Sequence, residues 1–215
     1  MAWVVLIAAI SGLSYAARFA ASGPEPRDLL FRPSTAIATF VLDGILLLVA
    51  LLIARGLPLR DAFALRAPTS WSQALRIAGV ALAATYATSL VLEIAVGHAA
   101  REQAVPQFWD PSRLGWFAAS AVAIAIFVPI VEESICRGIG FTLLQRWGEA
   151  VAIGGSAVAF ALAHGAVLDL PWVLVTGLGL SYLRSRTGSL YPCVALHATV
   201  NGIAVLVAAL VPAAT

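Results

Sequence analysis

Lysine is absent from this 215-residue chain, and charged residues of every kind make up only 11% of it. A soluble domain usually carries about 25% charged residues, whereas this chain is 61% hydrophobic and has a mean hydropathy of +0.94. The scarcity of charge excludes an ordinary soluble domain, and a net charge of +2 is too small to indicate nucleic-acid binding. The sequence predicts an integral protein of the lipid bilayer, and its compactness and exclusive use of arginine favour a bacterial plasma membrane.

Several patterns are also missing. No segment shows the alternation of a membrane strand, so the spanning elements should all be helices. No internal repeat is visible, which argues against a transporter built from inverted repeats. The H-E-x-x-H motif is absent, and no Cys or His pair has metal-ligand spacing. The two cysteines, Cys136 and Cys193, are therefore predicted to be buried free thiols rather than a disulfide or a zinc site.

Long apolar runs are what the chain does contain, and a membrane span needs about 20 such residues. The sequence predicts an all-α, polytopic transmembrane bundle of seven to eight helices. We expect a single integral membrane domain with N-terminal transmembrane helices over 1–114 and a catalytic helical core over 115–215. Pro129 is predicted to separate two helices. The predicted spans are 2–21, 36–54, 74–97, 115–131, 150–166, 170–183 and 189–211, with a further, more polar helix over 133–147.

An acidic cluster lies inside one of these apolar stretches. A charge near the bilayer centre costs about 2.5–3.5 kcal/mol on insertion scales, so such residues are usually functional. Glu133 and Arg137 are four residues apart and can pair on one helix face, which leaves the role of helix-pinning ion pair open for them. Glu132 points about 100° away and has no local partner. A carboxylate in such a pocket can serve as a general base.

Two histidines and an asparagine lie in other apolar runs. His164 follows Phe160 by four residues, and His197 precedes Asn201 by four. A lone buried His is most often a hydrogen-bonded core residue, but two of them beside Glu132 favour a shared site. Neutral imidazole and carboxylate can together hold and deprotonate a water, and a His–Asn pair can donate to an oxyanion. If the site uses a metal, Glu132, His164 and His197 would be the ligands of a zinc ion with an open water position.

The ordered string E-E-x-x-x-R-G, F-x-x-x-H and H-x-x-x-N resembles the CPBP family, the CAAX-protease and bacteriocin-processing family of intramembrane proteases. The resemblance covers about residues 115–210. It implies that Glu132 activates water with help from His164, and that His197 and Asn201 donate to the oxyanion. It implies that Glu133 and Arg137 support these groups, with Phe160 as part of the second motif. A metal-free mechanism is favoured, and zinc is kept as the alternative cofactor.

The expected function is therefore an intramembrane endopeptidase that acts on a membrane-associated peptide or protein. The rivals are a catalytically silent scaffold or immunity-type membrane protein and a small proton-coupled transporter. Other polar or aromatic residues receive simpler interpretations. Asp43 and Glu93 are expected to face the bundle interior. Four tryptophans near span ends are predicted to be interfacial anchors: Trp3, Trp109, Trp116 and Trp172.

Overall fold

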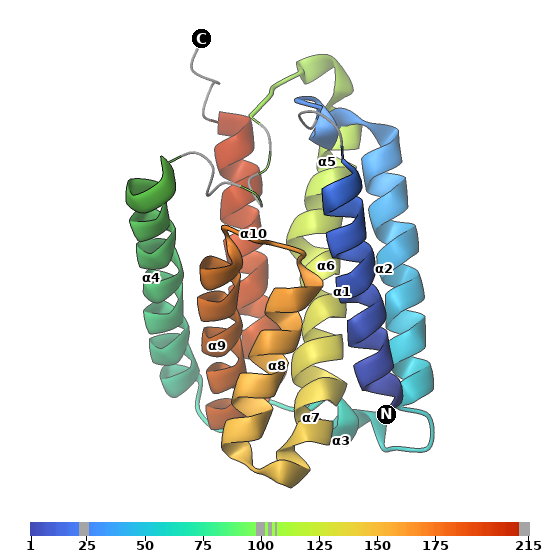
Figure 1. The fold of residues 1–215 in the computed structure, drawn as a ribbon, viewed down its shortest axis with the longest axis vertical. Helices are drawn as coiled ribbons and strands as arrows, with labels where there is room; N and C mark the ends of the chain where they lie inside the picture. The colour runs from blue at the N-terminus through green and yellow to red at the C-terminus, as the bar shows by residue number, and fades with distance from the viewer. Residues whose placement is uncertain (22–25, 98–101, 103–104, 106, 211–215) are drawn as a thin grey trace.

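The computed structural model describes residues 1–21, 26–97, 102, 105 and 107–210, and within these ranges it contains helices and no strand (Figure 1). The predicted all-helical bundle is thus confirmed. The long helices run side by side along the longest axis (Figure 1). They are α1 (Ala2–Ala20), α2 (Pro33–Ile53), α4 (Trp71–Val96), α8 (Glu149–Ala163), α9 (Leu170–Thr187) and α10 (Tyr191–Leu210), with the short η1 (Leu29–Phe31) and α3 (Leu59–Ala62) between them.

One continuous helical rod forms the centre of the bundle, from Pro111 to Trp147. Its consecutive segments are η3 (Pro111–Arg113), α5 (Leu114–Val122), η4 (Ala123–Phe127), α6 (Val128–Glu133), η5 (Ser134–Gly140), α7 (Phe141–Leu144) and η6 (Gln145–Trp147). Both η4 and η5 are π-helical. Such wide turns are rare and frequently lie at functional sites.

The predicted break at Pro129 is wrong, because the rod passes through this residue without interruption. A proline normally clashes with the carbonyl four residues before it in an α-helix. Here that carbonyl belongs to the π-helical turn η4, where hydrogen bonds reach one residue further. The wider turn accommodates the proline ring, so 115–131 and 133–147 form one helix instead of two.

Five helices of the described chain are long and apolar enough to cross a membrane: α1, α2, α4, the rod and α10. They correspond to the predicted spans 2–21, 36–54, 74–97, 115–131 and 189–211. The other two predicted spans form α8, which has only 15 residues, and α9, which carries Arg184 and Arg186 in its last turn. Both pack inside the bundle, α9 against α4 and α8.

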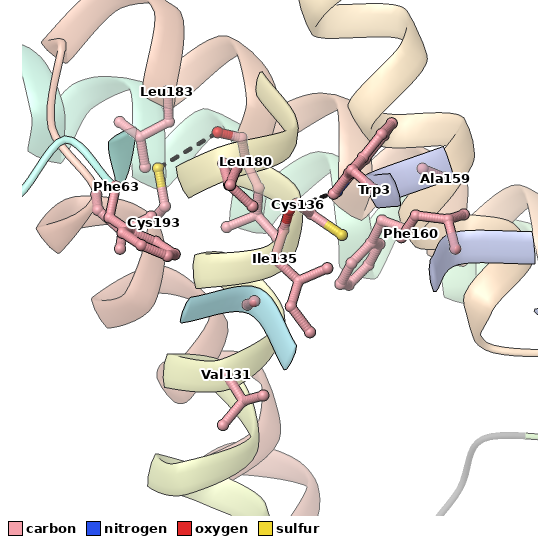
Figure 2. Close-up of a cluster of buried hydrophobic side chains, with 14 of the residues drawn as sticks. Trp3, Phe63, Val131, Ile135, Cys136, Ala159, Phe160, Leu180, Leu183 and Cys193 are labelled. Atoms are coloured by element: carbon pink, nitrogen blue, oxygen red, sulfur yellow. Dashed lines mark hydrogen bonds between the residues drawn. The ribbon is translucent and has the colours of Figure 1, made fainter. Parts of the chain in front are cut away.

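The hydrophobic core lies where the rod, α8, α9 and α10 meet. Leu180 and Leu183 of α9 are fully buried beside Cys193 of α10. The Cys193 thiol donates to the Leu180 carbonyl at 3.5 Å (Figure 2). Cys136 and Cys193 are both buried and free, as predicted.

The N-terminal helix α1 is fastened to the rod by Trp3. Its indole N–H donates to the Ile135 carbonyl of η5 at 2.9 Å (Figure 2). Gly140 permits this approach, because a Cβ there would lie 2.5 Å from the indole. Trp3 is only 6% exposed, so its predicted interfacial role is wrong. Further along α1, the Tyr15 hydroxyl donates to the Ala166 carbonyl at 3.0 Å.

Candidate active site

The acidic cluster lies at the junction of α6 and η5, near the middle of the rod. Every residue of η5 is buried, and so is Glu133 at the end of α6. Glu133 and Arg137 form the ion pair expected from their spacing, with Arg137 Nη1 and Glu133 Oε1 3.0 Å apart and both side chains fully buried. The pair is internal to the protein and has no access to water or lipid.

Arg137 is held by more than its carboxylate. Its Nη2 donates to the Gly177 carbonyl at 2.8 Å, and its Nε donates to Ser181 Oγ at 3.3 Å, both on α9. The guanidinium also lies 4.3 Å from the centre of the Phe160 ring. A buried charge is tolerable when its donors and its charge are matched in this way. Arg137 therefore fixes α9 and α8 against the rod.

Glu133 also holds His197 of α10. The same Oε1 atom lies 2.9 Å from His197 Nδ1, and the imidazole is 4% exposed. Because the carboxylate is paired with Arg137, it acts as an acceptor and His197 Nδ1 carries the proton. In a neutral His197 the Nε2 atom then carries a lone pair and can only accept a hydrogen bond. Nε2 can donate a hydrogen bond only when the ring is a positively charged imidazolium. This restricts how His197 can serve an oxyanion.

His164 is positioned by its own helix. It caps the C-terminal end of α8, and its Nδ1 lies 2.8 Å from the Phe160 carbonyl one turn earlier. A carbonyl can only accept, so Nδ1 again carries the proton and Nε2 faces away with its lone pair. The Phe160 ring lies tilted against this imidazole, with the ring centres 4.4 Å apart, and meets the His197 ring edge-on at 5.4 Å. Phe160 thus contacts both histidines as well as Arg137.

Glu132 lies between the two histidines. Its Oε2 atom is 3.8 Å from His164 Nε2 and 3.8 Å from His197 Nε2. The structure therefore brings together three side chains that are separated by up to 65 positions in the sequence and come from three helices. Glu132 Oε2 is buried and has no hydrogen-bond partner within the described part of the chain. Both separations exceed a direct hydrogen bond, but a bridging water could span them.

Asn201 lies one turn after His197 on α10. Its Nδ2 donates to the Ile124 carbonyl of η4 at 3.0 Å. An amide nitrogen has two N–H groups, so one remains for another acceptor. The π-helical turn η4 thereby orients Asn201, while η5 carries Arg137.

A cavity of about 700 Å³ opens onto these groups. Glu132, His164, His197 and Asn201 all line it, whereas the buried Glu133–Arg137 pair lies behind its wall. Trp172 of α9 also lines the cavity, which differs from the purely interfacial role predicted for it. Residues of α2 and α4 complete the opposite wall.

The predicted alternative of a zinc ion can be compared with this arrangement. Tetrahedral zinc with bonds of about 2.0–2.2 Å places neighbouring donor atoms roughly 3.4 Å apart. The distances from Glu132 Oε2 to the two imidazole nitrogens are 3.8 Å. Within the described ranges, no group of three His, Cys, Asp or Glu side chains is arranged to hold a metal ion. As the three side chains are placed here, these two separations are wider than the spacing of zinc ligands.

The sequence did not indicate several contacts that build this site. The link from Glu133 to His197 spans 64 positions and has no spacing signal. The backbone carbonyls of Gly177 and Ile124, which hold Arg137 and Asn201, leave no trace in residue types. The polar residues that interrupt apolar runs indicated which side chains belong to the site, but not which groups hold them in place.

Comparison with known families gives one match. Residues 114–203 match the family described as type II CAAX prenyl endopeptidase Rce1-like. This segment begins with α5 and ends within α10, so it contains all the motif residues and excludes α1 to α4. Searches among curated proteins and among solved structures give no match. The family resemblance predicted from the three motifs is confirmed, and with five apolar helices it indicates a membrane-embedded protease.

Proposed function

We propose that this chain, a member of the Rce1-like family through residues 114–203, is an intramembrane endopeptidase that hydrolyses a peptide bond of a membrane-associated protein or peptide. One observation carries the proposal. Glu132 Oε2 lies 3.8 Å from the Nε2 atoms of His164 and His197 on the wall of a cavity of about 700 Å³. A carboxylate and two imidazoles are costly within a bilayer unless they have a function.

A water molecule is the reactant that this arrangement suits. It can donate one hydrogen to Glu132 Oε2 and the other to His164 Nε2, which carries the lone pair of the ring because Nδ1 donates to the Phe160 carbonyl. The oxygen of this water then faces the scissile carbonyl carbon. Glu132 removes a proton as the water oxygen forms a bond to carbon, which gives a tetrahedral intermediate and a protonated Glu132.

Two donors can stabilise the negative oxygen of that intermediate. One is the Asn201 N–H that Ile124 does not use. The other is His197 Nε2–H, which requires the charged imidazolium because Nδ1 is committed to Glu133. Collapse of the intermediate breaks the C–N bond, and the proton on Glu132 passes to the departing nitrogen.

This sequence of steps uses only side chains of the protein and water. Glu133 and Arg137 act through His197 and through the packing of α9, so their role is positioning. Phe160 has a similar role, because its ring contacts Arg137 and both imidazoles. The absence of a cofactor is part of the proposal and is tested below by chelation.

The test compares purified wild type, Glu132→Gln and Glu149→Gln in lipid nanodiscs with a peptide library, and identifies new amino termini by mass spectrometry. The amide of Glu132→Gln keeps the shape of the side chain but cannot accept a proton, so cleavage should fall to background. Glu149 is a matched control, because its side chain is 54% exposed and outside the cavity. Equal cleavage by wild type and Glu132→Gln would refute the proposed base. Absence of cleavage by all three proteins would favour the scaffold or the transporter.

A further inference from the structure

Asp43 is a carboxylate that the proposed chemistry does not use. It lies at the middle of α2, a helix long and apolar enough to cross the membrane. Its side chain is half-buried and lines the same cavity as Glu132. Within the described part of the chain it makes no hydrogen bond and no ion pair. A charged group at this depth is costly, and its retention points to a function.

The residues that α2 and α4 contribute to the cavity lining are polar, although both helices are long and apolar enough to cross a membrane. Thr39 and Asp43 are one turn apart on α2, and Tyr86 and Ser89 are three residues apart on α4. All four line the cavity. Both helices lie outside the segment that matches the family, so this wall is a property of this chain rather than of the matched core.

Carboxylates predominate among the ionisable groups of the described cavity lining. It contains Asp43, Glu93, Glu132 and Asp169 beside the imidazoles of His164 and His197, but no arginine or lysine. Arg137, whose charge could balance them, is fully buried and engaged by Glu133, Gly177 and Ser181. A substrate that enters therefore meets negative potential beside the reactive carboxylate.

We infer that Asp43 binds a positively charged group of the substrate, either a Lys or Arg side chain or a free amino terminus, close to the bond that Glu132 hydrolyses. The inference rests on the proposed function, because it specifies the substrate class of the same site. A cation beside Asp43 forms an ion pair in a cavity with little water, where such pairs are strong.

The experiment uses full-length protein in lipid nanodiscs and a peptide library from a chymotryptic proteome digest, in which Lys and Arg occur within peptides. Wild type should cleave sites with a nearby Lys or Arg at least about tenfold more often than matched sites with Gln. This ratio is expected if the ion pair with Asp43 strengthens substrate binding about tenfold. Asp43→Asn should abolish this preference, and Asp43→Arg should shift it to Asp or Glu. Asp61→Asn, which changes an exposed carboxylate outside the cavity, should keep the wild-type preference.

A second library with acetylated amino termini separates the two sources of the cation. A preference that survives acetylation identifies a side chain, and one that disappears identifies the amino terminus. Cleavage by wild type with no preference for either cation would overturn the inference and leave the endopeptidase standing. Complete absence of cleavage would instead count against the proposed function.

Binding of a cation in the cavity can be measured without cleavage, so the inference can also be tested on a protein or variant that does not cleave peptides. Trp172 lines the cavity, so its fluorescence can report an occupant. Decylammonium and decyl sulfate share one chain and differ in charge. Wild type should show saturable quenching by decylammonium, weakened about tenfold in Asp43→Asn, and none by decyl sulfate. Equal quenching of wild type and Asp43→Asn by decylammonium would overturn the inference. If Asp43→Asn fails to fold, as judged by size-exclusion chromatography, the two amphiphiles are compared on wild type alone. Quenching by decylammonium alone supports the inference, and equal quenching by both amphiphiles overturns it.

Discussion

Replacing Glu133 by glutamine should destabilise the protein far more than replacing an exposed carboxylate. The change leaves the fully buried Arg137 without its counter-charge, because the glutamine oxygen, the Gly177 carbonyl and the Ser181 hydroxyl are all neutral acceptors. Breaking one partner of a buried pair costs about 3–5 kcal/mol. In a chain of this size 1 kcal/mol shifts Tm by about 2–4 °C, so Tm should fall by about 6–20 °C.

Thermal unfolding followed by tryptophan fluorescence in detergent measures this shift. Asp61→Asn is the control, because the Asp61–Arg66 pair is 3.3 Å apart with side chains 66% and 44% exposed. An exposed pair contributes at most about 1 kcal/mol, so this variant should lose no more than roughly 4 °C. The double variant Glu133→Gln with Arg137→Met should recover part of the loss, since no charge is then stranded. A Tm for Glu133→Gln equal to that of Asp61→Asn would show that the buried pair does not hold the helices together.

Four further predictions concern the site and its supports. Asn201→Ala should lower kcat by about 100- to 1000-fold without abolishing cleavage, because one oxyanion donor is lost; full activity in a peptide-cleavage assay would remove Asn201 from the mechanism. Prolonged chelation should leave wild-type cleavage unchanged, whereas activity lost on chelation and restored by zinc would overturn the metal-free mechanism. Gly138→Ala should lower Tm, because the new Cβ would lie 2.7 Å from the Phe63 ring, and a Tm equal to wild type would contradict that contact. Burial raises the pKa of Glu102, but hydrogen bonds from the backbone N–H groups of residues 167–169 and the charge of Arg18 outweigh it and lower the pKa below 4.5. The ionised Glu102 therefore stabilises the folded protein above its unfolded-state pKa, and this stabilisation is lost as pH falls. The Tm of wild type should exceed that of Glu102→Gln near neutral pH, and the difference should shrink below about pH 4.5. A Tm difference that does not depend on pH would refute this linkage.

The residue types predicted the helical architecture and the members of the candidate site, for a simple reason. Polar groups such as Glu132, His164 and His197 are conspicuous in apolar helices because the bilayer penalises them. Contacts made by the backbone are invisible to the same reasoning. Trp3 was predicted to lie at the interface, yet its indole N–H meets the Ile135 carbonyl in the core. Pro129 was predicted to end a helix, because a preceding π-helical turn cannot be inferred from apolar residues.

The position of Trp3 and Tyr15 in the chain has a consequence for biogenesis. Helix α1 leaves the ribosome before the rod and α8, and its two anchoring acceptors, the carbonyls of Ile135 and Ala166, follow 132 and 151 residues after their donors. At about 5–20 residues per second, Trp3 waits roughly 7–26 seconds for its acceptor. During that interval α1 is without its contacts to the rod and α8, and of the long helices it packs against only α2 precedes them in the chain. The final placement of Ile135 on η5 is therefore a late event of assembly, completed only when the first helix docks against helices made long after it.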